Sequence, residues 1–120
     1  MAGRFTIEDL RPRFARVVIQ NSEADLRPGG TVSGPTMFAL ADCAFYMLTL
    51  AMVGPEALAV TTGCSINFMR KPEPGRLIGD ARVLKLGRSL CVGDVTIHNG
   101  EPDKPAAHAS LTYSIPPKRV

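Results

Sequence analysis

The 120-residue sequence predicts one α+β domain in which a single long helix is wrapped by a curved antiparallel sheet of about five strands. Residues 35–53 form an apolar run of helical length that carries one charge, and residues 58–115 divide into strand-like segments separated by turns rich in Gly, Pro and Asn. A helix that is apolar on nearly every side must be buried on nearly every side. In a chain this short, a sheet curling round the helix is the arrangement that can bury it.

The segment before the apolar run is predicted to hold a short helix, a strand and a loop. Thr6, followed by Glu8 and Asp9, has the pattern of a helix start with acids in the first turn, and this helix would end before the next strand. Residues 14–20 (FARVVIQ) are rich in β-branched side chains and predict that strand. Residues 21–35 (NSEADLRPGGTVSGP) form a long polar loop, and a loop of this length in a compact domain indicates a functional task.

The apolar run is predicted to be a buried helix and not a membrane span. Pro35 suits the first helical position, and the pair Gly54-Pro55 ends the helix. The run of residues 35–53 nearly meets the length rule for a membrane span. However, Asp42 lies near its middle, where an ionised carboxylate in lipid costs several kcal/mol. The strands that follow also need a partner for their apolar faces, and the helix supplies one.

The rest of the chain predicts an antiparallel meander, because strand-like segments of about ten residues are joined by short turns. The predicted strands cover residues 58–70, 77–86, 89–98 and 106–115. One helix wrapped by a strongly curved antiparallel sheet is the hotdog architecture, and an α+β sandwich with another strand order is the alternative. The sequence contains no internal repeat or linker, so residues 1–120 are expected to form one domain.

Composition limits the classes of partner. The chain has 14 Lys and Arg against 11 Asp and Glu, scattered along the sequence, which argues against nucleic-acid binding and is compatible with a small anionic ligand or with solubility alone. The three cysteines lie in apolar runs, and their odd number argues against a disulfide framework and favours a reducing compartment. The first ten residues lack the apolar core of a signal peptide, so a cytoplasmic protein is expected.

Four motifs carry a family resemblance. A Gly-rich loop precedes the helix motif MFALADCAF, which is followed by the strand motif TTGCSINFMRKP, the turn KLGRS and the last strand AHASLTY. Across residues 14–116 this pattern resembles the PaaI-like acyl-CoA thioesterases of the hotdog superfamily. The resemblance implies hydrolysis of an acyl-CoA thioester, with coenzyme A as part of the substrate and no other cofactor. It also implies homodimers with sites at the subunit interface, often assembled into tetramers.

The resemblance assigns roles to residues of the helix and the loop before it. The family's general base or nucleophile corresponds to Asp42, and the backbone amide that polarises the thioester carbonyl corresponds to Gly34. Where the family usually has His-Gly-Gly, this chain has Ser33 directly before Gly34 and proline after it. An Asn common in the family corresponds to Arg27 in an ungapped alignment, which makes Arg27 a candidate substrate contact.

Residues after the helix are candidates for further contacts. Related thioesterases place a Ser or Thr near the attacking water in the region of Thr61 and Thr62, and of the two we favour Thr62, although threonine is also an ordinary strand residue. Coenzyme A carries phosphates, which call for exposed cations near the site. Arg70 and Lys71 after the strand, and Arg88 in the KLGR turn, are the candidate phosphate contacts.

These residues fit the chemistry of thioester hydrolysis, and the spacing between them requires two subunits. A helix N-terminus at Gly34 offers free N–H groups and a partial positive charge, and Asp42 can supply the base. The hydroxyl of Ser33 can hold water or the acyl carbonyl, or it can cap the helix. Gly34 and Asp42 are eight residues apart, which is about 12 Å of helical rise, whereas both must come within about 3 Å of one reacting carbon. The sequence therefore predicts a dimer in which Gly34 of one subunit meets Asp42 of the other.

Other chemistries fit the sequence less well. Cys43 lacks a histidine close in sequence, and His98 and His108 on late strands have no metal-ligand spacing, so neither a Cys–His pair nor a metal site is expected. A hotdog enoyl-CoA hydratase is one alternative function, but it typically pairs its acid with a histidine. A hotdog protein that binds acyl-CoA as a sensor, without turnover, is the other alternative.

Overall fold

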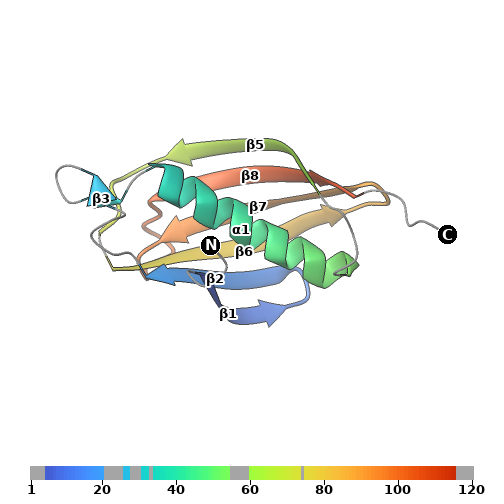
Figure 1. The fold of residues 1–120 in the computed structure, drawn as a ribbon, viewed down its shortest axis with the longest axis horizontal. Helices are drawn as coiled ribbons and strands as arrows, with labels where there is room; N and C mark the ends of the chain where they lie inside the picture. Colours follow the sequence, from blue (N-terminus) through green and yellow to red (C-terminus); the bar gives the residue numbers. More distant parts are fainter. Residues whose placement is uncertain are drawn as a thin grey trace.

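The structure, a computed structural model, describes residues 5–20, 26–27, 31–32, 34–54, 60–73 and 75–115. In these ranges one long helix crosses one face of an antiparallel sheet (Figure 1). The elements in chain order are β1 (Phe5–Arg11), β2 (Phe14–Gln20), β3 (Leu26–Arg27), β4 (Thr31–Val32), α1 (Gly34–Val53), β5 (Val60–Phe68), β6 (Arg76–Leu86), β7 (Leu90–His98) and β8 (Ala107–Ser114).

The six-stranded sheet has the order β1-β2-β6-β7-β8-β5, and every neighbouring pair is antiparallel. The short strands β3 and β4 pair with each other at one end of the molecule (Figure 1). This arrangement confirms the predicted hotdog fold, and the long helix, the strand at residues 14–20 and the four later strands lie within two residues of their predicted bounds. After α1 the chain crosses to the far edge, where β5 pairs with β8.

The predicted N-terminal helix is wrong, because its residues form the edge strand β1. β1 and β2 make a hairpin whose turn contains Arg13 with φ of 67°. The acids that suggested a helix start are instead paired with arginines, Asp9 with Arg11 at 3.1 Å and Glu8 with an arginine on β6. Local propensity is a weak prior, and pairing along the open edge of β2 outweighs it here.

Small residues on the sheet bring α1 close to it. A Cβ on Gly93 would lie 2.1 Å from the carbonyl oxygen of Arg82 and 2.3 Å from the ring of Phe45, so only glycine fits at that position. The side chain of Leu40 packs in the same way on Gly79. The buried side of α1 joins the core formed by inward-facing residues of β2, β6, β7 and β8. These contacts fix the position of the helix on the sheet.

The other side of α1 is open in the single chain, contrary to the expectation of burial on nearly every side. Phe38 and Tyr46 are each 41% exposed. By length and composition Gly34–Val53 could cross a membrane, and only 39% of the relevant 18-residue window is buried. The sheet lies against one side of the helix and covers only that side. The remaining apolar surface therefore needs a further partner if the helix is to be fully buried.

Candidate active site

Asp42 lies in the middle of α1, half-buried, with its side chain held by two hydroxyl groups. The hydroxyl of Thr61 on β5 donates a hydrogen bond to Oδ1 at 3.0 Å, and the phenol of Tyr113 on β8 donates to the same oxygen at 2.6 Å. The Tyr113 oxygen is also 3.0 Å from the backbone carbonyl of Asp42. Within the described part of the chain, Oδ2 of Asp42 has no hydrogen-bond partner. Among the described residues, one carboxylate oxygen is thus anchored and the other is open.

The register of the sheet brings the two donors together. Thr61 is paired directly with Tyr113 across the β5–β8 ladder, next to an irregularity between Thr61 and Gly63. Tyr113 is 1% exposed and occupies the inward-facing row of β8, where its ring packs edge-on against Phe45 with centroids 5.2 Å apart. A buried phenol normally finds a hydrogen-bond partner, and here that partner is the helix carboxylate.

The environment of Asp42 keeps the neighbouring groups protonated. Burial, followed by the hydrogen bond to Asp42, raises the pKa of Tyr113 well above its ordinary value, so the phenol remains a donor through the neutral and mildly alkaline range. Burial, followed by the negative charge of Asp42, also raises the pKa of Cys43 and Cys64. These thiols are therefore poor sources of a thiolate nucleophile.

The other residues predicted around the carbonyl do not all gather at Asp42. Gly34 begins the helix, and a Cβ at that position would lie 3.4 Å from the ring of Phe68. The hydroxyl of Thr62 donates to the carbonyl of Thr112 at 3.2 Å, so it is Thr61, and not Thr62, that contacts Asp42. Ser33 and the side chain of Arg27 lie outside the described residues. Gly34 and Asp42 share one uninterrupted helix, so within one chain they are about 12 Å apart along its axis.

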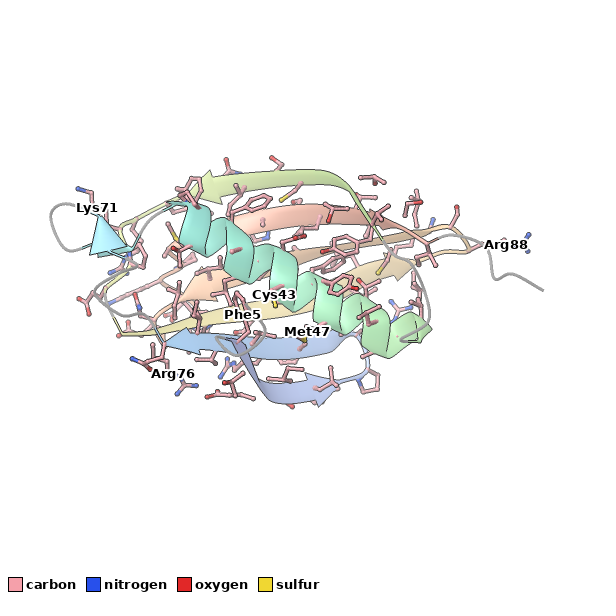
Figure 2. The ribbon with its side chains drawn as sticks, viewed as in Figure 1. Phe5, Cys43, Met47, Lys71, Arg76 and Arg88 are labelled. Atoms are coloured by element: carbon pink, nitrogen blue, oxygen red, sulfur yellow. The ribbon has the colours of Figure 1, made fainter. Side chains whose placement is uncertain are left out.

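The cations predicted to contact phosphate are divided between the two ends of the molecule. Arg70 and Lys71 follow β5 at the end where α1 begins, and both are exposed. Arg88, in the turn between β6 and β7, lies at the opposite end of the long axis, which extends over 52 Å (Figure 2). One protomer therefore cannot bring all of these side chains to the same phosphate group.

The sequence profile of the thioesterase superfamily matches residues 29–106. The chain belongs to the thioesterase superfamily. A crystal structure of a candidate thioesterase from Silicibacter sp. TM1040 is 53% identical to it, covering 97% of this chain and 81% of that one, with a TM-score of 0.88. The PaaI protein from the phenylacetic acid degradation operon of E. coli is 26% identical over 93% of this chain and 79% of its own, with a TM-score of 0.83. These similarities confirm the resemblance to the PaaI-like thioesterases.

A relative in Deinococcus radiodurans, described as a candidate esterase, is 33% identical over 97 residues. These residues are 80% of this chain and 64% of that protein, so the chain spans less than two thirds of the length of this relative.

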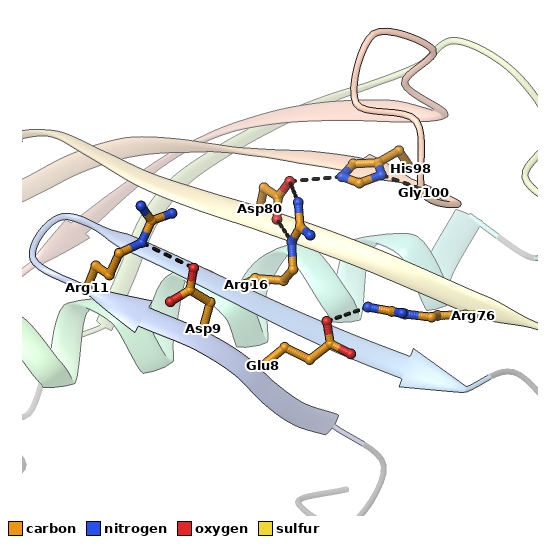
Figure 3. A network of polar contacts seen from close by, with 8 residues as sticks. All are labelled: Glu8, Asp9, Arg11, Arg16, Arg76, Asp80, His98 and Gly100. Atoms are coloured by element: carbon orange, nitrogen blue, oxygen red, sulfur yellow. Dashed lines mark hydrogen bonds and ion pairs between the residues drawn. The ribbon is translucent and has the colours of Figure 1, made fainter.

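The histidines of this superfamily member lie on the face of the sheet opposite α1. His98 Nε2 is 2.8 Å from Oδ2 of Asp80, and its Nδ1 accepts a hydrogen bond from the N–H of Gly100, which leaves the Nε2 proton for Asp80 (Figure 3). His108 Nε2 is 3.0 Å from Oδ2 of Asp94. Neither histidine lies beside the carboxylate of Asp42 or the thiol of Cys43. Among the described residues, no group of three or more His, Cys, Asp or Glu side chains could hold a metal ion.

Tyr113 is the residue of this site that sequence reasoning missed. The other inward-facing positions of β8 are apolar, namely Ala107, Ala109 and Leu111. A tyrosine in such a row brings a hydroxyl into the core, and a buried hydroxyl requires a partner. The one charge on the apolar helix, Asp42, was the obvious partner, so this contact could have been predicted once helix and strand were packed together.

Proposed function

We propose that the protein hydrolyses an acyl-CoA thioester to the free acid and coenzyme A, with Asp42 as the base or nucleophile. The observation that supports this most directly is the carboxylate itself, on a helix that begins at Gly34. It is held through Oδ1 by Thr61 and Tyr113, and Oδ2 is open in the part of the chain that the structure describes. A carboxylate held in one orientation, with one oxygen open, suits proton transfer or attack. Membership of the thioesterase superfamily supports the same chemistry.

The reaction needs a donor for the negative charge that develops on the thioester oxygen. The N–H of Gly34 at the start of α1 is such a donor, because the first amides of a helix have no partner within the helix. On the general-base route, Oδ2 of Asp42 takes a proton from water as the water attacks the carbonyl carbon, and the tetrahedral intermediate then expels the CoA thiolate. On the nucleophilic route, Oδ2 attacks, the thiolate leaves, and water opens the resulting anhydride.

The donor and the acid must come from different subunits, because they are about 12 Å apart along one helix. The open side of α1 and the free edge of β5 supply a surface for a second copy of the chain. Phe38 and Tyr46 on the helix are half-exposed, and β5 leaves Val60 56% exposed and Phe68 53% exposed. An exposed apolar edge strand favours pairing with another chain. We place the two composite sites of a homodimer here, and further assembly into a dimer of dimers would leave them intact.

The coenzyme A end of the substrate is assigned to Arg70 and Lys71, which are exposed and follow β5. Lys71 lies at the end of the molecule where α1 begins (Figure 2). Their side chains have no ion-pair partner among the described residues, so both are available to phosphate groups. Arg88 at the far end is available for a phosphate only if another subunit brings it close. Ser33 and Arg27, next to the helix start in sequence, are left as candidate contacts for the acyl group.

The test is thiol release from a panel of short-chain, medium-chain and aryl acyl-CoAs. Asp42→Asn is well suited to it, because the amide oxygen can still accept from Thr61 and Tyr113 while an NH2 group replaces the open oxygen. We expect a loss of about two orders of magnitude or more in kcat. Asp103→Asn, which removes the same charge from an exposed loop, is the matched control and should keep full activity. Undiminished turnover by Asp42→Asn would refute the mechanism.

Two further measurements separate the alternatives. Binding of acyl-CoAs without turnover of any of them would favour the sensor function. Single-turnover hydrolysis in isotopically labelled water, followed by mass spectrometry of the peptide that contains Asp42, tests the nucleophilic route. Label in Asp42 shows that the carboxylate attacked the thioester and that water then opened the anhydride at the Asp42 carbonyl carbon. Opening of the anhydride at the acyl carbon puts the label in the free acid, as the general-base route does.

A further inference from the structure

We propose that Tyr113 is a positioning residue that locks Asp42 through Oδ1 and so makes Oδ2 the reacting oxygen. This inference deepens the proposed function and rests on it. It assigns a role to a core tyrosine on β8, far along the chain from the helix, and it distinguishes the two oxygens of the carboxylate by the hydrogen bonds that they receive.

The geometry at Tyr113 holds Asp42 at two points. The phenol oxygen is 2.6 Å from Oδ1, the shorter of its two contacts, and 3.0 Å from the backbone carbonyl of the same residue. A hydroxyl has one proton, and the shorter distance to the charged group indicates that the carboxylate receives it. Because one oxygen atom bridges the side chain and the main chain of Asp42, rotation of the carboxylate away from this orientation breaks a charge-assisted hydrogen bond.

Tyr113 is itself fixed in place. Its side chain is 1% exposed, and its ring makes an edge-on contact with Phe45, which is one turn along α1 from Asp42. Burial and the hydrogen bond to Asp42 raise the pKa of its phenol, so it stays protonated and donates through the neutral and mildly alkaline range. A donor that neither moves nor ionises suits the task of orienting a catalytic group.

Thr61 completes the anchoring of Oδ1. Its hydroxyl donates from the opposite strand at 3.0 Å, so two donors converge on one carboxylate oxygen. Among the described residues, Oδ2 receives no hydrogen bond and keeps its lone pairs for water or for the thioester carbon. The two oxygens therefore differ in role before any substrate binds.

The distinguishing consequence is a change in kcat without a change in KM. Loss of the Tyr113 hydroxyl leaves the carboxylate in place but free to rotate, so the fraction in the reactive orientation falls. A residue that serves only the core would lower stability and leave the kcat of the folded enzyme unchanged.

The experiment measures kcat and KM of thiol release for Tyr113→Phe, beside Asp42→Asn and wild type. Tyr113→Phe keeps the ring against Phe45 and should lower kcat about tenfold, with KM within about twofold. Thr49→Val is the matched control, because it removes another buried hydroxyl of the same region that contacts Cys91 and not Asp42. Its kcat and its KM should both match wild type.

A folded Tyr113→Phe variant with unchanged kcat would overturn the positioning role. If that variant does not fold, Thr61→Val decides, since it removes the second donor from an exposed edge strand. We expect it to lower kcat as well, with KM within about twofold, and an unchanged kcat would overturn the proposal. Asp42→Asn separates this failure from that of the proposed function. An inactive Asp42→Asn beside an unaffected Tyr113→Phe removes only the positioning role, whereas an active Asp42→Asn removes the function.

Discussion

A heterodimer built from two inactive subunits should recover activity if the site is shared between chains. Gly34→Pro removes the N–H at the helix start, and Asp42→Asn removes the open carboxylate oxygen. Eight residues of one helix separate the two positions by about 12 Å, four times the distance of about 3 Å that each group must have from the reacting carbon. In a dimer of one variant with the other, one site therefore pairs an intact Gly34 with an intact Asp42, and the second site lacks both.

The magnitude follows from this count of intact sites. Each parent homodimer should lose about two orders of magnitude in kcat. A heterodimer isolated through two different affinity tags should then have about half of the wild-type kcat per dimer, roughly fifty times that of either parent. Gly34→Ala keeps the N–H, and its Cβ would make an ordinary contact of 3.4 Å with Phe68, so it serves as the control for substitution at this position. A purified heterodimer with no more activity than its parents would refute the shared site.

Three further predictions concern stability and binding. Because the pKa of Tyr113 is raised, the unfolded chain loses the phenol proton above about pH 10 while the folded chain keeps it. The free energy of unfolding should therefore fall as the pH rises above this value, more steeply in wild type than in Tyr113→Phe. The difference in slope should reach up to about 1.4 kcal/mol per pH unit, as measured by urea unfolding. Gly93→Ala should lower the free energy of unfolding by about 1–3 kcal/mol or more, because its Cβ would overlap a backbone carbonyl of the facing strand. Replacement of Arg70 and Lys71 by Gln should raise KM for acyl-CoA about tenfold at low salt, with kcat unchanged. The same replacement should leave KM unchanged for the acyl-pantetheine thioester, which lacks the phosphates of the nucleotide.

The elements whose boundaries depend on local chemistry were predictable from the sequence. The apolar run ended by Gly54, where φ is 102°, gave α1, and the turns rich in Gly, Pro and Asn separated the later strands at nearly the observed positions. The first strand illustrates the opposite case. Residues 5–11 carry the acids of a helix start, and only the open edge of β2 makes them a strand, which is information that no local window contains.

The candidate site also contains residues that the local sequence predicts and residues whose role depends on packing. Asp42 and Gly34 were proposed as site residues from their place on one helix and from the family resemblance, and their spacing predicts a second subunit. Sequence alone could not decide between Thr61 and Thr62, because an irregularity in the β5–β8 register determines which hydroxyl faces the helix. Tyr113 was missed because its role depends on the packing of α1 against β8.

Tyr113 belongs both to the packed core and to the proposed catalytic site. Its ring contacts Phe45 and its hydroxyl contacts Asp42, and these two residues are three positions apart on α1, so they lie on neighbouring parts of the helix surface. Phe45 in turn rests on Gly93 of β7, where no larger residue fits. A slide of α1 by one turn, about 5.4 Å, would separate all three contacts at once. The close approach of the helix to the sheet therefore sets the orientation of the carboxylate, and a substitution that lifts α1 from β7 should lower kcat as well as stability.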